Sequence, residues 1–245
     1  MAYHIPQLLG YHGVELHAFD ELMGGKNQWA NVFRSPKLWD LYAIRYVLTP
    51  AQVGASPDSL PGFVRRSAPV TTASGTSVRV FERASPPAYA WVATAALKLD
   101  DSSAVQAVLD PRLPKRAVVL LAPDAPVEPP RLTAIPDTLD VTATVTAWEP
   151  GRMTIALNPA PDTAAYVVVA ENWYTQWHAT VDGAAAPVLR GNVAEMAVPV
   201  PAGAREITLE YASAPYRLGR AITFLSLVAV IAFLAIPPAL RRRRG

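Results

Sequence analysis

Hydrophobic and polar residues alternate along much of the chain with the period of two that is typical of half-buried β-strands. The alternation is clear in Val78–Arg83 (VRVFER) and again in Val141–Ala147, where threonines separate the apolar residues. Residues 137–215 contain about seven such short segments, with turn residues such as Asp182-Gly183 between them. This spacing predicts an antiparallel β-sandwich over residues 137–215.

Helical patterns occur among the strands in the first half of the chain. Ser35-Pro36 is a typical start for a short helix, and Asp101–Leu109 has a capping residue and helical spacing of its apolar residues. The apolar run Ala117–Ala122 indicates a buried strand. We expect a small α+β domain over residues 1–122, and therefore a mixed α+β fold overall. Five prolines within residues 123–136 predict a semi-rigid linker between the two domains.

The strongest single pattern is the C-terminal run Ala221–Leu240, whose 20 residues contain no charged side chain. At about 1.5 Å per residue, a helix of this length spans the roughly 30 Å hydrocarbon core of a bilayer. A buried core helix is the alternative, but core helices of this length ordinarily keep a polar face. We predict a transmembrane helix over residues 216–240 and a basic cytoplasmic tail over residues 241–245.

Arginines flank this span unequally. Arg217 and Arg220 precede it, and Arg241, Arg242, Arg243 and Arg244 follow it. By the positive-inside rule, the C-terminus is expected in the cytoplasm and the N-terminal region outside the cell (inner) membrane. These six arginines are the candidate determinants of membrane orientation.

Composition narrows the classes of protein. The 245 residues include 22 basic and 20 acidic side chains, and without the four C-terminal arginines 18 basic residues remain, so the formal charge changes from +2 to −2. Hydrophobic residues make up 51% and charged residues 17%, which excludes a disordered chain. The absence of a basic stripe argues against a nucleic-acid partner. Because the chain has no cysteine, disulfides, thiolate metal sites and cysteine nucleophiles are excluded.

The first 25 residues do not have the pattern of a signal peptide, because His, Glu and Asp fall throughout them. The sequence therefore contains a segment that would anchor the chain in a membrane, but none that would direct the N-terminal region across it. Two explanations stay open. The chain is the C-terminal piece of a longer multi-span protein, or it is tail-anchored with its soluble part in the cytoplasm.

One series of motifs is recognisable in the second half of the chain: a strand ending in an acidic residue, an aromatic pair, a further tryptophan, a strand and an Asp-Gly turn. Its residues are Glu171, Trp173, Tyr174, Trp177, Asp182 and Gly183. A Pro-Ala-Gly turn follows within Val198–Gly203. Together with Gly10–Leu22 and Leu38–Pro50, this series resembles the C-terminal extracytoplasmic region and last transmembrane helix of the YfhO-like bacterial membrane protein family.

The resemblance implies a large multi-span protein of glycosyltransferase type C architecture, linked to cell-envelope sugar transfer from polyprenyl-phosphate donors. It also implies that the catalytic carboxylate lies in an early loop outside this chain. We therefore predict no catalytic residue and no cofactor here, and no enzyme activity of the chain on its own. The expected partners are the lipid bilayer, an upstream multi-span portion or subunit, and a polyprenyl-linked sugar or cell-envelope glycan.

The densest polar cluster lies near the N-terminus. His17 and Glu21 are four residues apart, and His17 and Asp20 are three apart, so that a helix would place them on one face. A metal site needs three or four convergent ligands. We predict no metal here and weigh a polar pocket against a solvated helix start. The candidate pocket residues are Tyr11, His12, His17 and Asp20.

An aromatic cluster occurs at Trp173, Tyr174 and Trp177, with His178 next to it and Asp182 nearby. Aromatic rings stack on sugars and also gather at the membrane–water interface, but they are most often core residues. We expect core packing first, and retain Trp173, Tyr174, Trp177 and Asp182 as candidate sugar or interface contacts.

The chain has no nucleophile elbow, phosphate loop, dinucleotide fingerprint or zinc-protease motif. We therefore expect the membrane-anchored C-terminal part of a YfhO-like type C glycosyltransferase. The alternative is a standalone, membrane-anchored β-sandwich that binds a carbohydrate or a protein.

Overall fold

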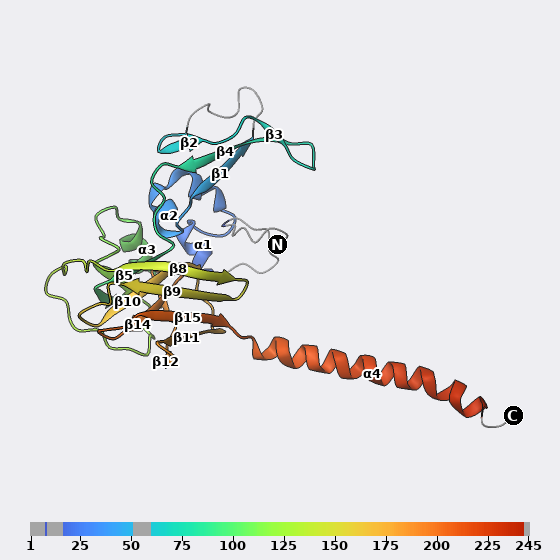
Figure 1. Cartoon of the computed structure of the whole chain (residues 1–245). Coiled ribbons are helices and arrows are strands. Elements are labelled where there is room, and N and C mark those ends of the chain that lie inside the picture. The colour runs from blue at the N-terminus through green and yellow to red at the C-terminus, as the bar shows by residue number, and fades with distance from the viewer. Residues whose placement is uncertain (1–7, 9–16, 51–59, 243–245) are drawn as a thin grey trace.

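The computed structural model describes residues 8, 17–50 and 60–242, with side chains described as far as residue 234. Within these residues the fold is mixed α+β, as predicted, with three β-sheets and a long C-terminal helix (Figure 1). The helices are α1 (His17–Leu22), the 3-10 helix η1 (Trp29–Arg34), α2 (Pro36–Leu41), α3 (Asp101–Leu109) and α4 (Ala214–Arg242).

The first sheet has the order β1-β4-β2, with β3 paired to β4. Its strands are β1 (Tyr46–Pro50), β2 (Phe63–Arg65), β3 (Val70–Thr71) and β4 (Ser77–Arg83). The second sheet has the order β5-β10-β14-β13-β7-β6. Its strands are β5 (Ala90–Ala93), β6 (Ala95–Lys98), β7 (Val118–Leu121), β10 (Ala165–Asn172), β13 (Leu189–Gly191) and β14 (Glu195–Val200). The third sheet has the order β12-β11-β15-β9-β8. Its strands are β8 (Thr142–Glu149), β9 (Arg152–Asn158), β11 (Trp177–Val181), β12 (Ala184–Ala186) and β15 (Glu206–Tyr211).

The second and third sheets pack face to face as a β-sandwich. Val167 and Met196 from the second sheet and Ile155 and Leu209 from the third are fully buried in one shared core. In β8 the threonines are exposed, while Ala143 is buried and packs on this core. The alternation in the sequence therefore follows from the two environments of each strand.

The second sheet curls into a half-barrel. Its edge strands β5 and β6 are consecutive in the chain and only Thr94 separates them. Side chains on the inner side form a core of mostly small residues around Trp91. Gly191 lies on this crowded side, because a Cβ atom there would approach the Cβ of Ala197 to 3.0 Å and the Cγ2 of Val119 to 3.1 Å.

The sheets do not follow the predicted division of the chain into residues 1–122 and 137–215. Strands β5, β6 and β7 precede the Pro-rich segment 123–136, yet they share a sheet with β10, β13 and β14, which follow it. The pair β6–β7 is also parallel rather than antiparallel, with α3 as the crossover between the two strands. Every residue of β5 and β7 is buried. Strands buried on both faces require a layer on each side, which the rest of the sandwich and the helices supply.

A helical layer covers the outer side of β7, where α1, η1, α2 and α3 pack on Val118 and Leu120. Two of these helices begin where the sequence predicts. The Oγ of Ser35 accepts a hydrogen bond from the N–H of Leu38 at 3.4 Å, and the carboxylate of Asp100 accepts one from the N–H of Ser103 at 3.0 Å.

Helix α4 leaves the sandwich at the end of β15 and extends away from it (Figure 1). It has 29 residues, from Ala214 to Arg242, and is therefore slightly longer at both ends than the predicted span 216–240. Its most apolar part, Ala214–Leu234, is not buried against any described part of the protein. This exposure is the opposite of what a core helix would show.

Candidate functional site

The predicted N-terminal pocket residues are only partly described. Tyr11 and His12 lie outside the described residues. His17 is exposed on α1, and its Nε2 lies 3.2 Å from Oε1 of Glu21, so these two residues share a helix face as predicted. Asp20 is half-buried on the same helix. Among the residues that the structure describes, no three His, Asp or Glu side chains are arranged to hold a metal ion.

The predicted aromatic cluster is divided between the core and the surface. Trp173 and Trp177 pack against the sandwich core, and the Nε1 of Trp173 donates to the carbonyl of Val188 at 3.0 Å. Tyr174 is 41% exposed, and its ring centroid lies 6.3 Å from that of Tyr211. Trp177 contacts the same Tyr211 ring edge-on at 5.5 Å. The tryptophans are therefore packing residues, and the tyrosines are available at the surface.

Asp182 is not part of this aromatic cluster. It lies beyond the opposite end of β11 from Trp177, about 16 Å away at 3.3 Å per strand residue. With φ of 49°, it makes the tight turn into β12. Its carboxylate accepts hydrogen bonds from the N–H groups of Arg205 at 3.2 Å and Glu206 at 2.9 Å. Asp182 thus ties the β11–β12 hairpin to the start of β15.

The arginines flank the apolar stretch of α4 as the sequence suggests. Arg217 and Arg220 are exposed in the first turns of the helix. Arg241 and Arg242 belong to its last turn, and Arg243 and Arg244 lie outside the described residues.

The strongest cluster of perturbed titratable side chains surrounds Glu195, at the start of β14. Glu195 is fully buried and, by strand alternation, lies on the same side of β14 as Ala197, inside the half-barrel. Its Oε2 accepts a hydrogen bond from the Nδ2 of Asn192 at 2.7 Å, whereas Oε1 has no hydrogen-bond partner within the described part of the chain. Burial raises the pKa of Glu195 to about 8, although Asn192 and Lys115 act in the opposite direction. The carboxyl group therefore keeps its proton at neutral pH.

The turn that carries Asn192 is strained. Asn192 and Val193 have φ of 46° and 76°, and a β-branched residue rarely adopts this left-handed region. Hydrogen bonds hold the turn against β7: the N–H of Asn192 donates to the carbonyl of Leu120 at 2.6 Å, and its Oδ1 accepts from the N–H of Leu120 at 3.0 Å. Asn192 thus joins the half-barrel strands to the buried carboxyl of Glu195.

Lys115 approaches the cluster from the segment before β7. Its Nζ donates to the carbonyl of Asp40 at 2.7 Å and lies 4.2 Å from the centroid of the Trp91 ring, a cation–π distance. Burial lowers the pKa of Lys115, and electrostatic interactions with the carboxyl groups of Glu195 and Asp40 oppose this effect. The lysine therefore links α2 to the inner side of the half-barrel.

Two tyrosines border the same region. Tyr42 follows α2, and its buried hydroxyl has no hydrogen-bond partner in the described structure. Burial raises the pKa of Tyr42, with a further contribution from Glu195. The hydroxyl of Tyr89 donates to Oε2 of Glu171 at 2.8 Å, and burial also raises the pKa of that carboxyl group. These residues bring together α2, β10 and β14, where polar groups with raised pKa values can hold protons away from water.

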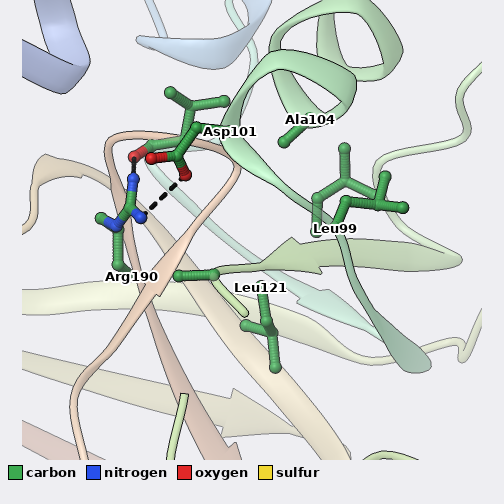
Figure 2. A pocket seen from close by; sticks show the side chains of 8 residues that line it. Leu99, Asp101, Ala104, Leu121 and Arg190 are labelled. Atoms are coloured by element: carbon green, nitrogen blue, oxygen red, sulfur yellow. Dashed lines mark hydrogen bonds and ion pairs between the residues drawn. The ribbon is translucent and has the colours of Figure 1, made fainter. Parts of the chain in front are cut away.

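Arg190 fastens the strained turn to α3 (Figure 2). Its Nη2 donates to Oδ1 of Asp101 at 2.8 Å, and its Nη1 donates to the carbonyl of Val193 at 3.2 Å. Leu99, Ala104 and Leu121 line a shallow depression beside this pair, and the depression encloses no space for a small molecule. Arg190 therefore connects α3, through Asp101, with the strained turn, through Val193.

Sequence reasoning missed this buried cluster. One signal was present: Glu195 is the single charged residue in the apolar run Val193–Val200. An acidic residue in a buried strand has either a partner or a raised pKa. Lys115, Tyr42 and Trp91 gave no comparable signal, because their proximity to the cluster arises only from the tertiary fold.

Comparisons with known protein families, curated proteins and solved structures gave no match to this chain. The resemblance to the YfhO-like family therefore stays a prediction based on the residues named above.

Proposed function

We propose that the chain works as a membrane-anchored extracytoplasmic module, the C-terminal part of a YfhO-like type C glycosyltransferase. The observation that carries the anchor is helix α4, whose apolar stretch Ala214–Leu234 is exposed and is separated from β15 by Ala212 and Ser213 alone. Exposed apolar surface costs roughly 25 cal/mol per Å² in water, and a soluble monomer rarely exposes a continuous patch of this kind. A single span in a lipid bilayer removes that cost.

The charge pattern supports the orientation in this proposal. Four arginines follow the span and two precede it, which favours a cytoplasmic C-terminus and an external sandwich. In this arrangement the sandwich would stand beside the external mouth of the multi-span portion. Its role would be to position the lipid-linked donor or the acceptor, while catalysis takes place in the multi-span portion.

A second candidate is a standalone module that binds a carbohydrate, and the exposed rings of Tyr174 and Tyr211 favour it. Exposed tyrosine rings offer apolar faces on which sugar rings stack, with a hydroxyl group for hydrogen bonding. The two candidates differ in whether this chain functions together with a multi-span partner.

An immunoblot of membranes from the native cells, with an antibody against residues 137–215, separates the candidates. The glycosyltransferase proposal predicts either a polypeptide much larger than the 26.4 kDa of this chain, or this chain in a stable complex with a multi-span subunit after mild detergent extraction. Cells with the gene deleted provide the control. A 26.4 kDa chain that purifies without a companion contradicts the proposal.

The standalone candidate makes its own prediction for glycan binding by the purified full chain. Tyr174→Ala should reduce binding to cell-envelope glycans, whereas Tyr46→Ala, which removes a similarly exposed tyrosine from the first sheet, should not. Equal binding by both variants and the unaltered chain would argue against sugar stacking on Tyr174.

A further inference from the structure

The end of the third sheet that adjoins α4 gathers exposed aromatic rings. The strand register places Trp177 opposite Tyr211 and Arg152 opposite Glu210, so that the ends of β9, β11 and β15 meet here. Tyr174 and Tyr211 are 41% and 40% exposed. Tyr216 follows in the first turn of α4 and is 68% exposed. We call Tyr174, Tyr211 and Tyr216, together with Arg217 and Arg220, the collar.

The connection between the sandwich and α4 is short and hydrogen-bonded. The N–H of Tyr211 donates to the carbonyl of Gly151 at 2.7 Å, and the N–H of Ala212 donates to the carbonyl of Gln176 at 2.9 Å. Ser213 then caps the helix, because its Oγ accepts from the N–H of Tyr216 at 3.3 Å and its carbonyl accepts from the N–H of Arg217 at 3.1 Å. No flexible linker therefore separates the sandwich from α4.

The length of the first helical turns sets the depth of the collar. The uncharged run begins at Ala221, seven residues after the helix begins at Ala214, which corresponds to about 10 Å along the helix axis. The headgroup layer on each side of the hydrocarbon core is about 5–8 Å thick. Arg217 and Arg220 then lie within that layer, and Tyr216, five residues or about 7.5 Å before the uncharged run, lies at its outer edge. The tyrosines at the end of the sheet lie just outside the layer and face it.

The chemistry of the collar suits this depth. Tyrosine and tryptophan prefer the membrane–water interface because they have an apolar ring and a polar tip. Arginines beside the hydrocarbon boundary reach lipid phosphates with their guanidinium groups. The end of the sheet also carries Glu149, Arg152 and Glu210, so it is not basic itself. The rings, rather than net charge, therefore provide the attraction between the sheet and the lipid.

We propose that the collar is a lipid-binding surface that seats the sandwich directly on the phospholipid headgroup layer in a fixed orientation. We call this contact between the sandwich and the headgroup layer the seat. It depends on the proposed membrane anchor, and it adds that the third sheet itself touches lipid. The far end of the third sheet, with the Asp182 turn and residues 159–164, then points away from the membrane, one strand length or about 17 Å further out.

Fluorescence quenching in vesicles tests this seat, because the cysteine-free chain permits single labels. Thr175, in the exposed loop beside Tyr174, is replaced by cysteine and labelled with an environment-sensitive fluorophore. The matched variant is Thr163→Cys, in an exposed loop at the far end, where the carbonyl of Pro161 accepts from the N–H of Gly203. The full chain is reconstituted in phosphatidylcholine vesicles that contain a lipid with a nitroxide quencher on its headgroup.

The seat predicts several-fold stronger quenching at position 175 than at position 163. A four-residue Gly-Ser insertion after Ser213 should reduce the difference, because it frees the sandwich from the helix, whereas the same insertion after Asp162 should leave quenching at position 175 unchanged. Tyr174→Ser should weaken quenching at the Thr175→Cys site without releasing the chain from the vesicles.

The outcomes separate this proposal from the anchor. A chain that stays with the vesicles during flotation, but shows equal quenching at both positions, overturns the seat and leaves the anchor intact. A chain that does not float with the vesicles overturns the anchor, and the seat with it.

Discussion

Glu195 is acidic in the sequence but neutral in the folded protein near pH 7, because burial raises its pKa to about 8. Its neighbours explain why it is tolerated. Asn192 donates one hydrogen bond to it, and the positive charge of Lys115 favours its ionised form. Both interactions offset part of the cost of burying the carboxyl group. A buried carboxyl group of this kind lowers stability as the pH rises, and that cost can be measured.

The first prediction concerns Glu195→Gln. In the unfolded chain this carboxyl titrates near 4.5, so between about pH 4.5 and 8 the folded state holds a proton that the unfolded state releases. The free energy of unfolding should therefore fall as the pH rises through this window, by up to about 1.4 kcal/mol per pH unit. Glutamine cannot ionise, so the variant should lose this slope. Denaturant unfolding of the full chain in detergent, followed by tryptophan fluorescence, measures it.

Glu206→Gln is the matched control, because Glu206 is exposed at the start of β15 and its replacement should leave the slope in place. Equal slopes for the unaltered chain and Glu195→Gln would mean that Glu195 does not hold a proton in the folded protein.

At the scale of secondary structure, Gly191 decides how closely the half-barrel can curl. It is the residue of β13 that pairs with Leu121 of β7, and it therefore lies at the junction between strands from the two halves of the chain. The atoms that a new Cβ would meet belong to Ala197 and Val119, both fully buried on neighbouring strands. Such neighbours have little room to move.

The second prediction follows: Gly191→Ala should destabilise the protein by about 1–3 kcal/mol, the usual cost of overpacking a core. Gly219→Ala is the matched control, because no atom lies within 4 Å of a Cβ placed at that helical position. The control should lose no stability. Thermal unfolding of both variants measures the effect, and a Gly191→Ala variant as stable as the control would show that the half-barrel is loosely packed there.

The sequence predicted those elements whose signals are local. The helices at α2 and α3 start at their capping residues, and the Asp182-Gly183 turn joins β11 to β12 as expected. The curl of the second sheet could not be predicted from local signals. It depends on β5 and β7 pairing with strands more than 60 residues away in the chain. The pairing of strands across residues 123–136 was hidden for the same reason, because proline content reports local stiffness and not which strands pair.

The candidate site could likewise be predicted only where its signal is local in the sequence. The aromatic residues were visible as a cluster in the sequence, but their separation into core tryptophans and exposed tyrosines depends on the ends of β10 and β11. Lys115 and Tyr42 join Glu195 only through the packing of the helical layer on the half-barrel, so no spacing rule could find them.

For the whole molecule, the hydrophobic C-terminus separates a nearly neutral sandwich from a strongly basic tail. The third prediction is that Leu227→Arg together with Ile231→Arg should make α4 fail as an anchor, because each arginine near the centre of a span costs about 3 kcal/mol. The conservative pair Leu227→Ile and Ile231→Leu should behave like the unaltered chain. Extraction of membranes with alkaline carbonate measures the change, and retention of the arginine variant in the pellet would contradict a single apolar span.

The accessibility of single cysteines, in intact cells stripped of their outer layers, reports directly on which side of the membrane the sandwich lies. Ser74→Cys lies in the exposed turn before β4, and Gly245→Cys lies at the C-terminus, each providing the single thiol of its chain. A membrane-impermeant maleimide should label Ser74→Cys from outside, and should label Gly245→Cys only after the membrane is permeabilised. Labelling of Gly245→Cys from outside, with Ser74→Cys protected, would contradict an external sandwich held by one C-terminal span.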